Sequence, residues 1–294
     1  MEFFIFVPQI RTTFDRLVTT ALAAEAAGFV GMTGMDHIEA PGAVGKSNFE
    51  TTTLNTWIAA RTTRLKVGSL ITCDTFRHPV MLAHHAVTLD HASNGRFELG
   101  IGWGSWAPDF EKFGFEPSQP RDRVARLGET LDVLKALWSG ESVDYDGQFH
   151  KLRDAVLSPT PLGRIPIMIG GSGPKTLALV RKHADWWNLD TRYADKMQGQ
   201  AYEDLRAQIG TARVSIQQKV AYVAPGMDRD AVSEVARRRF GRSATPQLGS
   251  GPELVDYFAE LAGRGVERVY AWFSDLASPD TLTGFGEEVI KPLS

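Results

Sequence analysis

The segment IPIMIGGSGPKTLALVRKHADWWNL, at residues 165–189, decides the fold. An apolar run over residues 165–171 predicts a strand, and the spacing of apolar residues over 174–184 predicts a helix. A second apolar run follows at residues 186–189. Two buried strands joined by one helix are typical of a β-α-β unit, in which the strands lie parallel.

The same alternation runs along the whole chain. It predicts strands at residues 3–7, 29–35, 65–72, 96–102, 165–171, 186–189, 214–223 and 266–273. Helical segments are predicted between them, at residues 14–27, 52–61, from 79, 122–138, 174–184, after 228, at 252–263 and at the end of the chain. Eight such units predict an α/β fold, a single (β/α)8 TIM barrel spanning residues 1–294.

Three segments depart from this alternation. SVDYDGQFHKL, at residues 142–152, alternates about Asp146-Gly147 and predicts a β-hairpin inserted before strand five. Residues 190–198 and 241–251 are polar and predict loop insertions after strands six and seven. Neither loop separates two cores, so one domain is expected.

Composition excludes several classes of function. The chain has 32 Lys and Arg against 35 Asp and Glu, a net charge of −3, so no general attraction to nucleic acid is expected. Its one cysteine, Cys73, permits no intrachain disulfide. The N-terminal residues lack a basic stretch, and no apolar run reaches membrane-spanning length. We therefore expect a cytoplasmic protein.

Functional residues of a TIM barrel lie at the C-terminal ends of its strands. Strand two ends in Gly34-Met35-Asp36-His37, which places an acid and an imidazole at the barrel mouth. Histidine can bind a cofactor ring or pass a proton, because its ordinary pKa lies near neutrality. Alternatively, Asp36 caps the next loop and His37 only packs.

Strands three and four carry weaker signals. GSLIT, at residues 68–72, is equally expected of any buried strand. GIGWG, at residues 100–104, has alternate glycines that would let a flat ring approach the backbone, although a glycine-rich turn would look the same. It lacks the spacing of a dinucleotide-binding fingerprint.

Strand five gives the most specific motif. Gly170-Gly171-Ser172-Gly173-Pro174 leads directly into a helix. Free N–H groups and the positive end of the helix dipole would bind phosphate there, and proline suits the first helical turn. A flexible turn is the alternative.

Other chemistries lack support. His84, His85 and His91 share one helix, but no carboxylate or HExxH pattern accompanies them, so no metal site is expected. No nucleophile elbow or phosphate-binding GxxxxGK[ST] motif is present.

Taken together, GMDH, GSLIT, the stretch FRHPVMLAHHAVTLDHASNGRFELGIGWG, the helix RLGETLDVLKALW and the segment IPIMIGGSGPKTLALVRKHADWWN resemble the luciferase-like superfamily over residues 2–188. The resemblance is strongest to its coenzyme F420 (deazaflavin) branch, and it implies roles for individual residues. Asp36 and His37 match the acid-histidine pair beside the cofactor ring. Ser69-Leu70 matches a bulge whose non-prolyl cis bond supports that ring. Contacts to the ring and its ribityl chain are implied for Thr72, Gly102, Trp103 and Gly104, and contacts to the phosphate for Gly170, Gly171, Ser172 and Gly173.

Two positions depart from the sugar-phosphate dehydrogenases of this family. Ser105 stands where they have a glutamate, and Pro41 where they have a tryptophan. A sugar phosphate is therefore not the expected substrate. Trp103 and Trp106 would instead offer aromatic surface to a flat or apolar organic molecule.

The resemblance implies an oxidoreductase that transfers hydride between F420 and a small organic substrate, with His37 handling the proton. One alternative keeps the fold but uses FMN, supplied by a separate flavin reductase, in a two-component monooxygenase. Another is a non-catalytic flavin-binding barrel. The family also implies a homodimer, to which the helices after strands two and three would contribute.

Overall fold

A closed barrel of parallel strands forms the centre of the computed structural model, which describes residues 1–115, 119–190, 199–241 and 245–294. Eight strands follow one another around it as β10-β12-β1-β2-β3-β5-β8-β9, and β9 pairs with β10 to close the ring. The bounds are β1 Glu2–Phe6, β2 Gly31–Gly34, β3 Lys66–Ser69, β5 Phe97–Gly102, β8 Ile167–Gly170, β9 Trp186–Asp190, β10 Arg213–Tyr222 and β12 Val266–Phe273. The predicted (β/α)8 barrel is confirmed.

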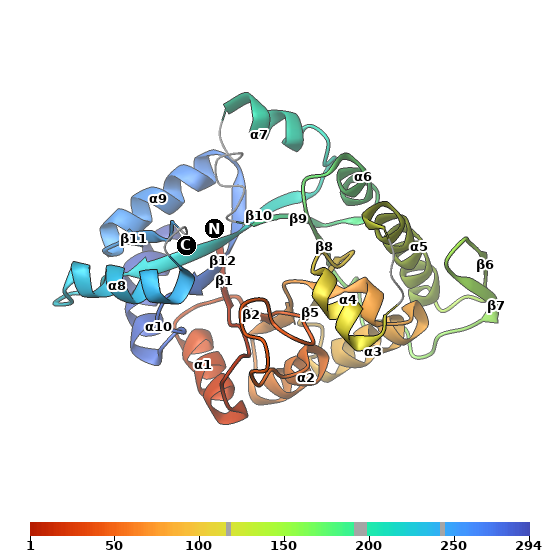
Figure 1. The fold of residues 1–294 in the computed structure, drawn as a ribbon, viewed down its shortest axis with the longest axis horizontal. Helices are drawn as coiled ribbons and strands as arrows, with labels where there is room; N and C mark the ends of the chain where they lie inside the picture. The colour runs from red at the N-terminus through yellow and green to blue at the C-terminus, as the bar shows by residue number, and fades with distance from the viewer. Residues whose placement is uncertain (116–118, 191–198, 242–244) are drawn as a thin grey trace.

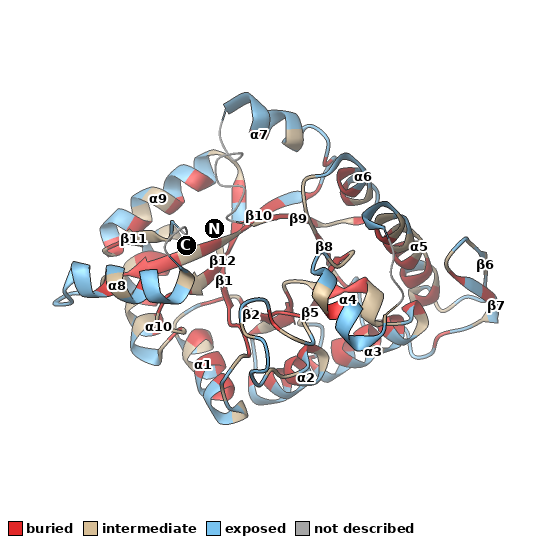
Figure 2. Ribbon diagram, viewed as in Figure 1, coloured by how far each residue is buried: buried red, intermediate tan, exposed pale blue. Residues whose placement is uncertain are grey.

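Helices surround the strands, as Figure 1 shows. They are α1 Phe14–Ala26, α2 Thr51–Arg61, α3 Pro79–Ala92, α5 Pro120–Trp138, α6 Pro174–His183, α7 Gly199–Arg206, α8 Arg229–Phe240, α9 Gly251–Gly263 and α10 Pro279–Phe285. Short helical turns occur at Asp74–Phe76, Gly286–Ile290 and Lys291–Leu293. The helices turn buried faces toward the barrel and exposed faces outward (Figure 2). None of the helices in the described ranges is both long and apolar enough to cross a bilayer.

The insertions only partly match the prediction. The hairpin before strand five is confirmed as β6 (Val143–Asp146) and β7 (Lys151–Ala155). The segment predicted as a loop at 241–251 contains a strand, β11 (Gln247–Gly249), so that prediction was wrong there. β10 extends far enough at its C-terminal end to offer a free edge, with which β11 pairs. Of the loop predicted at 190–198, residues 191–198 lie outside the described residues.

The third barrel strand, β3, is interrupted near its C-terminal end. It leaves the barrel after Ser69, and β4 (Thr72–Cys73) resumes pairing with β5. A non-prolyl cis bond joins Leu70 to Ile71, so its predicted place at Ser69-Leu70 was wrong by one residue. The Leu70 N–H still donates to the Gly34 carbonyl at 2.8 Å. The Ser69-Leu70 peptide therefore remains in the ladder, and the chain departs only beyond it.

A buried charge network fills the N-terminal end of the barrel. The Arg268 side chain is only 1% exposed, and its guanidinium bonds Glu98 and Glu2. It also stacks on the Trp186 ring, with 3.8 Å between the guanidinium carbon and the ring centroid. Lys66 completes the network through Glu98 at 2.7 Å. Paired charges thus occupy this end of the barrel.

The buried His183 at the end of α6 predicts acid sensitivity. Burial lowers its pKa to about 4, and the neighbouring Lys135 adds to this effect. In the unfolded chain its pKa returns to about 6.5. Below that pH the unfolded state takes up a proton that the folded state does not, so stability falls by up to about 1.4 kcal/mol per pH unit until about pH 4. We expect His183→Gln to lose less melting temperature than the wild type between pH 7 and pH 5. Lys151→Gln, at an exposed position of the β6-β7 hairpin, is the control, and equal losses in all three proteins would contradict the assignment.

Candidate active site

A cavity of about 510 Å³ opens at the C-terminal ends of the barrel strands. Most of the predicted site residues line it, namely Asp36, His37, Leu70, Thr72, Gly102, Trp103, Gly104, Gly170 and Gly171. Trp106 and Ser105 also reach it. The strand ends that were predicted separately from the sequence therefore meet in one place.

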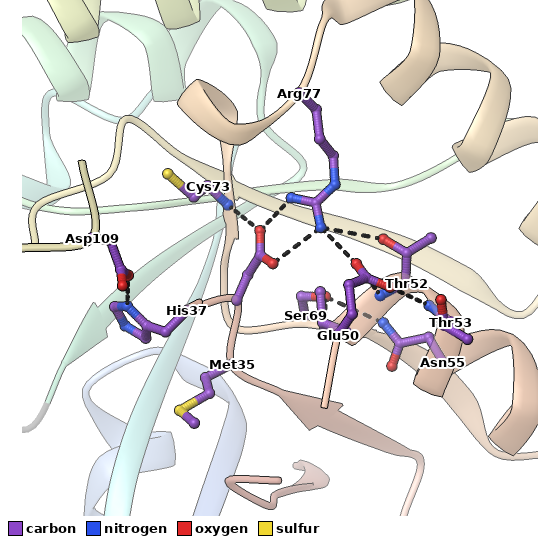
Figure 3. A network of polar contacts seen from close by, with 12 residues as sticks. Met35, His37, Glu50, Thr52, Thr53, Asn55, Ser69, Cys73, Arg77 and Asp109 are labelled. Atoms are coloured by element: carbon purple, nitrogen blue, oxygen red, sulfur yellow. Dashed lines mark hydrogen bonds and ion pairs between the residues drawn. The ribbon is translucent and has the colours of Figure 1, made fainter. Parts of the chain in front are cut away.

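Ser69, Ser172 and Gly173 do not line this cavity. The Ser69 hydroxyl is buried and bonds Thr51 at 2.9 Å and Asn55 at 3.2 Å, so it faces α2 (Figure 3). Only its backbone could contribute to a cofactor site. Ser172 and Gly173 lie one step further along the turn that leads into α6.

The imidazole of His37 is held by an aspartate that the sequence analysis missed. His37 Nδ1 lies 2.8 Å from Asp109 Oδ2, and the Asp109 side chain is 1% exposed (Figure 3). The other oxygen of Asp109 accepts the N–H of Glu39 at 2.9 Å. With the proton of neutral histidine on Nδ1, this contact leaves Nε2 as the acceptor.

Asp109 lies in α4 (Ala107–Phe113), a short helix that no periodicity revealed. The helix comes close to the barrel because Gly104, at φ +75°, has no side chain. A Cβ there would lie 2.6 Å from both Cys73 Sγ and a Phe110 ring carbon. The only signal in the sequence was an acid a few residues beyond the strand-four glycines.

Asp36 is occupied by other contacts. One oxygen accepts from the Cys73 N–H at 2.7 Å and from Arg77 at 2.5 Å, and the other from Arg77 at 3.0 Å. Arg77 also binds Glu50 at 2.7 Å, as Figure 3 shows. A carboxylate held in this way positions the segment after strand two. The contacts favour Asp109, and not Asp36, as the acid that acts on His37.

Two further side chains, Glu50 and Cys73, are each held in a single protonation state. Burial acts to raise the pKa of Glu50, but the N–H groups of Thr53 and Thr52, together with Arg77, lower it to about 2. Burial and the charge of Asp36 raise the pKa of Cys73 to about 12. Glu50 therefore stays ionised beside Arg77, and Cys73 remains a thiol and not a nucleophile.

The glycine turn after β8, the fifth barrel strand, opens onto the cavity. Gly171 adopts φ +123°, which few side chains tolerate, and its carbonyl accepts from the Trp187 indole at 2.8 Å. Gly173 precedes α6, and no side chain caps that helix. Its first N–H groups, at Lys175 and Thr176, therefore have no capping partner from Gly173. This arrangement suits an anionic group.

Side chains from β9 and β10, the sixth and seventh barrel strands, complete the cavity. Asn188 of β9 and Gln217 of β10 both line it, and the Asn188 amide donates to the Ser215 hydroxyl at 3.0 Å. Sequence reasoning did not select either residue, because single amides inside apolar strands carry no spacing signal. Among the described residues, no group of three His, Cys, Asp or Glu side chains could hold a metal ion.

Comparison with known proteins identifies the class. The family model described as "Luciferase-like monooxygenase" matches residues 1–274, and the chain belongs to this family. The resemblance inferred from the sequence is therefore confirmed.

Individual relatives are only distantly similar to this chain in sequence. F420-dependent glucose-6-phosphate dehydrogenase of Mycobacterium avium (strain 104) is 33% identical over 161 residues, which cover 54% of this chain and 48% of that protein. The chain thus matches about half the length of these curated relatives. An F420-dependent secondary alcohol dehydrogenase, solved with an F420-acetone adduct, superposes with a TM-score of 0.82 at 17% identity over 98% of both chains. A monooxygenase from Streptomyces bottropensis gives a TM-score of 0.78 at 19% identity over 100% of both chains. These two structures support the fold.

Proposed function

We propose that this protein is an oxidoreductase that transfers hydride between coenzyme F420 and a small organic substrate. The observation that supports this proposal most strongly is a single cavity. It is lined by His37, which Asp109 holds, and by the glycines at the ends of β5 and β8. The curated relative and the secondary alcohol dehydrogenase are both F420-dependent enzymes. We also propose that residues 1–294 act as one barrel domain in the cytoplasm.

The residues fit a flat cofactor with an anionic tail. A Cβ at Gly102 would lie 2.4 Å from Ile71 Cδ1, so glycine lets the Ile71 side chain pack closely against the end of β5. Leu70, Ile71 and Thr72 would support the ring, with Trp103 and Gly104 beside it. The turn at 170–173 and the start of α6 would hold the phosphate. When bound, a deazaflavin supplies a ring carbon that carries hydride.

The side chains of the protein manage orientation and the proton. Asp109 fixes the ring of His37, so that Nε2 can accept a proton from an alcohol or, once protonated, donate one to a carbonyl. Asp36 and Arg77 fix the backbone that carries His37. Trp103 and Trp106 line one side of the cavity, and Ser105 takes the place of the glutamate of sugar-phosphate dehydrogenases. We therefore propose an electron-poor organic substrate and not a sugar phosphate.

Two alternatives share this fold. An FMN-dependent monooxygenase would use the same cavity together with a flavin reductase, and one of the solved neighbours is a monooxygenase. A non-catalytic flavin-binding barrel would have no need for the buried Asp109 beside His37. The pairing of these two side chains favours an enzyme.

Oxygen dependence separates hydride transfer from oxygenation. We expect reduced F420 to be oxidised by the protein with ketones or unsaturated carbonyl compounds at the same rate with and without oxygen. Substrate conversion that requires reduced FMN and oxygen would instead support the monooxygenase. Conversion with neither cofactor would contradict the proposal.

We propose a homodimer formed through α2 and α3, which contact each other. Their outward positions include Trp57, 48% exposed, and Met81, 49% exposed, and carry no carboxylate. A second copy would bury these two apolar side chains. We expect Trp57→Glu to convert the dimer to a monomer in light scattering at micromolar concentration, whereas Val235→Glu on α8 leaves it dimeric. A monomeric wild type, or a dimeric Trp57→Glu, would remove the proposal.

A further inference from the structure

One wall of the barrel mouth is aromatic. Phe6 ends β1, and Trp272 lies next to last in β12, with their ring centroids 5.3 Å apart. The ring centroid of Phe240, the last residue of α8, lies 5.2 Å from that of Trp272. We call Phe6, Phe240 and Trp272 the aromatic wall. None of these three residues is among those proposed above to hold the cofactor.

The order of strands places this wall opposite the glycines. In the closed ring, β12 and β1 stand four strands away from β5 and β8, respectively. Gly102 ends β5 and Gly170 ends β8. A ring held against the glycines would therefore face the aromatic wall across the mouth. That is the position of a substrate.

Lys219 lies in this wall. It pairs in register with Trp272 on the neighbouring strand, and its Nζ lies 5.7 Å from the ring centroids of both Trp272 and Phe240. Side chains alternate along a strand, so Lys219 points to the same face as Gln217, which lines the cavity. Lys219 is half-buried, and it lies two residues nearer than Gln217 to the C-terminal end of β10.

The ammonium of Lys219 has no carboxylate within ion-pair distance among the described residues. Other basic side chains around the site do: Arg77 pairs with Asp36, Arg126 with Asp74 and Lys112 with Glu39. The Trp272 indole N–H is also buried without an acceptor in the part of the chain that the structure describes. The aromatic wall thus holds one buried donor without an acceptor, and the Lys219 ammonium beside it is not buried and so is open to an anionic ligand.

We propose that Lys219 binds the carboxylate of a flat, aromatic carboxylic acid substrate, whose ring packs on the aromatic wall. The aromatic rings attract the cation but offer its N–H groups no acceptor, whereas a carboxylate pairs with the charge and accepts hydrogen bonds from it. The inference rests on the proposed function, since it names the substrate class of the same site. It adds Lys219 as the residue that determines specificity.

The test compares two probes of the same shape, 2-naphthoate and neutral 2-naphthamide, whose binding is measured by quenching of tryptophan fluorescence with F420 present and absent. The proteins are the wild type, Lys219→Met, Lys219→Arg and the control Lys151→Met, which changes an exposed lysine of the β6-β7 hairpin. We expect wild type and Lys151→Met to bind naphthoate about tenfold more tightly than naphthamide, which is the size of effect a partly buried ion pair supports. Lys219→Met should bind the two probes equally, and Lys219→Arg should keep the preference.

The outcomes distinguish this inference from the proposed function. The F420 dissociation constant should be unchanged in Lys219→Met, because the residue lies on the wall opposite the cofactor glycines. A wild type that binds F420 but shows no preference for naphthoate, including no binding of it, overturns the role of Lys219 alone. A preference that persists in Lys219→Met also overturns it. Loss of F420 binding in the wild type would instead contradict the proposed function.

Discussion

His37→Asn is expected to slow turnover by about 10² to 10⁴-fold while F420 affinity stays close to that of the wild type. An amide can still donate to the Asp109 carboxylate, which His37 Nδ1 contacts at 2.8 Å. It cannot accept and return a proton as Nε2 of an imidazole does. The loss should therefore appear in kcat and not in the dissociation constant of the cofactor.

Asp109→Asn is the companion variant. An asparagine keeps the size of the side chain, but the amide can present its NH₂ group to His37 and thereby favour the other tautomer. We expect kcat to fall in this variant as well, and the fold to be retained. Single-turnover hydride transfer at saturating cofactor measures both variants. Unchanged transfer in the folded, cofactor-loaded His37→Asn would exclude the proton role. A joint loss of stability and binding, with normal turnover of the bound fraction, would indicate a packing role.

Gly171→Asp should abolish cofactor binding, because a carboxylate in the turn that leads into α6 repels phosphate. Any side chain at φ +123° also strains the backbone, and a Cβ would lie 3.3 Å from Thr176 Cγ2. Gly171→Ala carries the same strain without the charge and is the matched control. We expect Gly171→Ala to bind weakly and Gly171→Asp not at all.

Equilibrium titration of both variants, with circular dichroism to verify folding, makes the comparison. Native affinity in Gly171→Asp would place the phosphate elsewhere. Equal losses in the two variants would mean that backbone geometry, and not charge, accounts for the effect.

Periodicity predicted the barrel because each strand end carries its own signal. The runs at 165–171 and 266–273 contain β8 and β12, and the glycine turn before Pro174 marks the start of α6. His37 was found in the same way, from its place just after a buried strand. Local patterns of this kind are short-range, so they survive without knowledge of the folded structure.

Long-range partners could not be found in this way. Asp109 reaches His37 from a helix 72 residues further along the chain, and Arg77 reaches Asp36 over 41 residues. Lys219 becomes significant only because β10 and β12 are neighbours in the closed barrel. These contacts depend on strand order and register, which hydrophobic periodicity does not encode. β11 was missed for the same reason, since the free edge of β10 exists only in the fold.

The most direct test of the account is an equilibrium titration of the purified protein with F420 and, in parallel, with FMN, followed by absorption and fluorescence. The account predicts saturable binding of F420 with a perturbed ring spectrum, weaker binding of FMN, and loss of F420 binding in Gly171→Asp. Tight binding of FMN without measurable binding of F420 would contradict it.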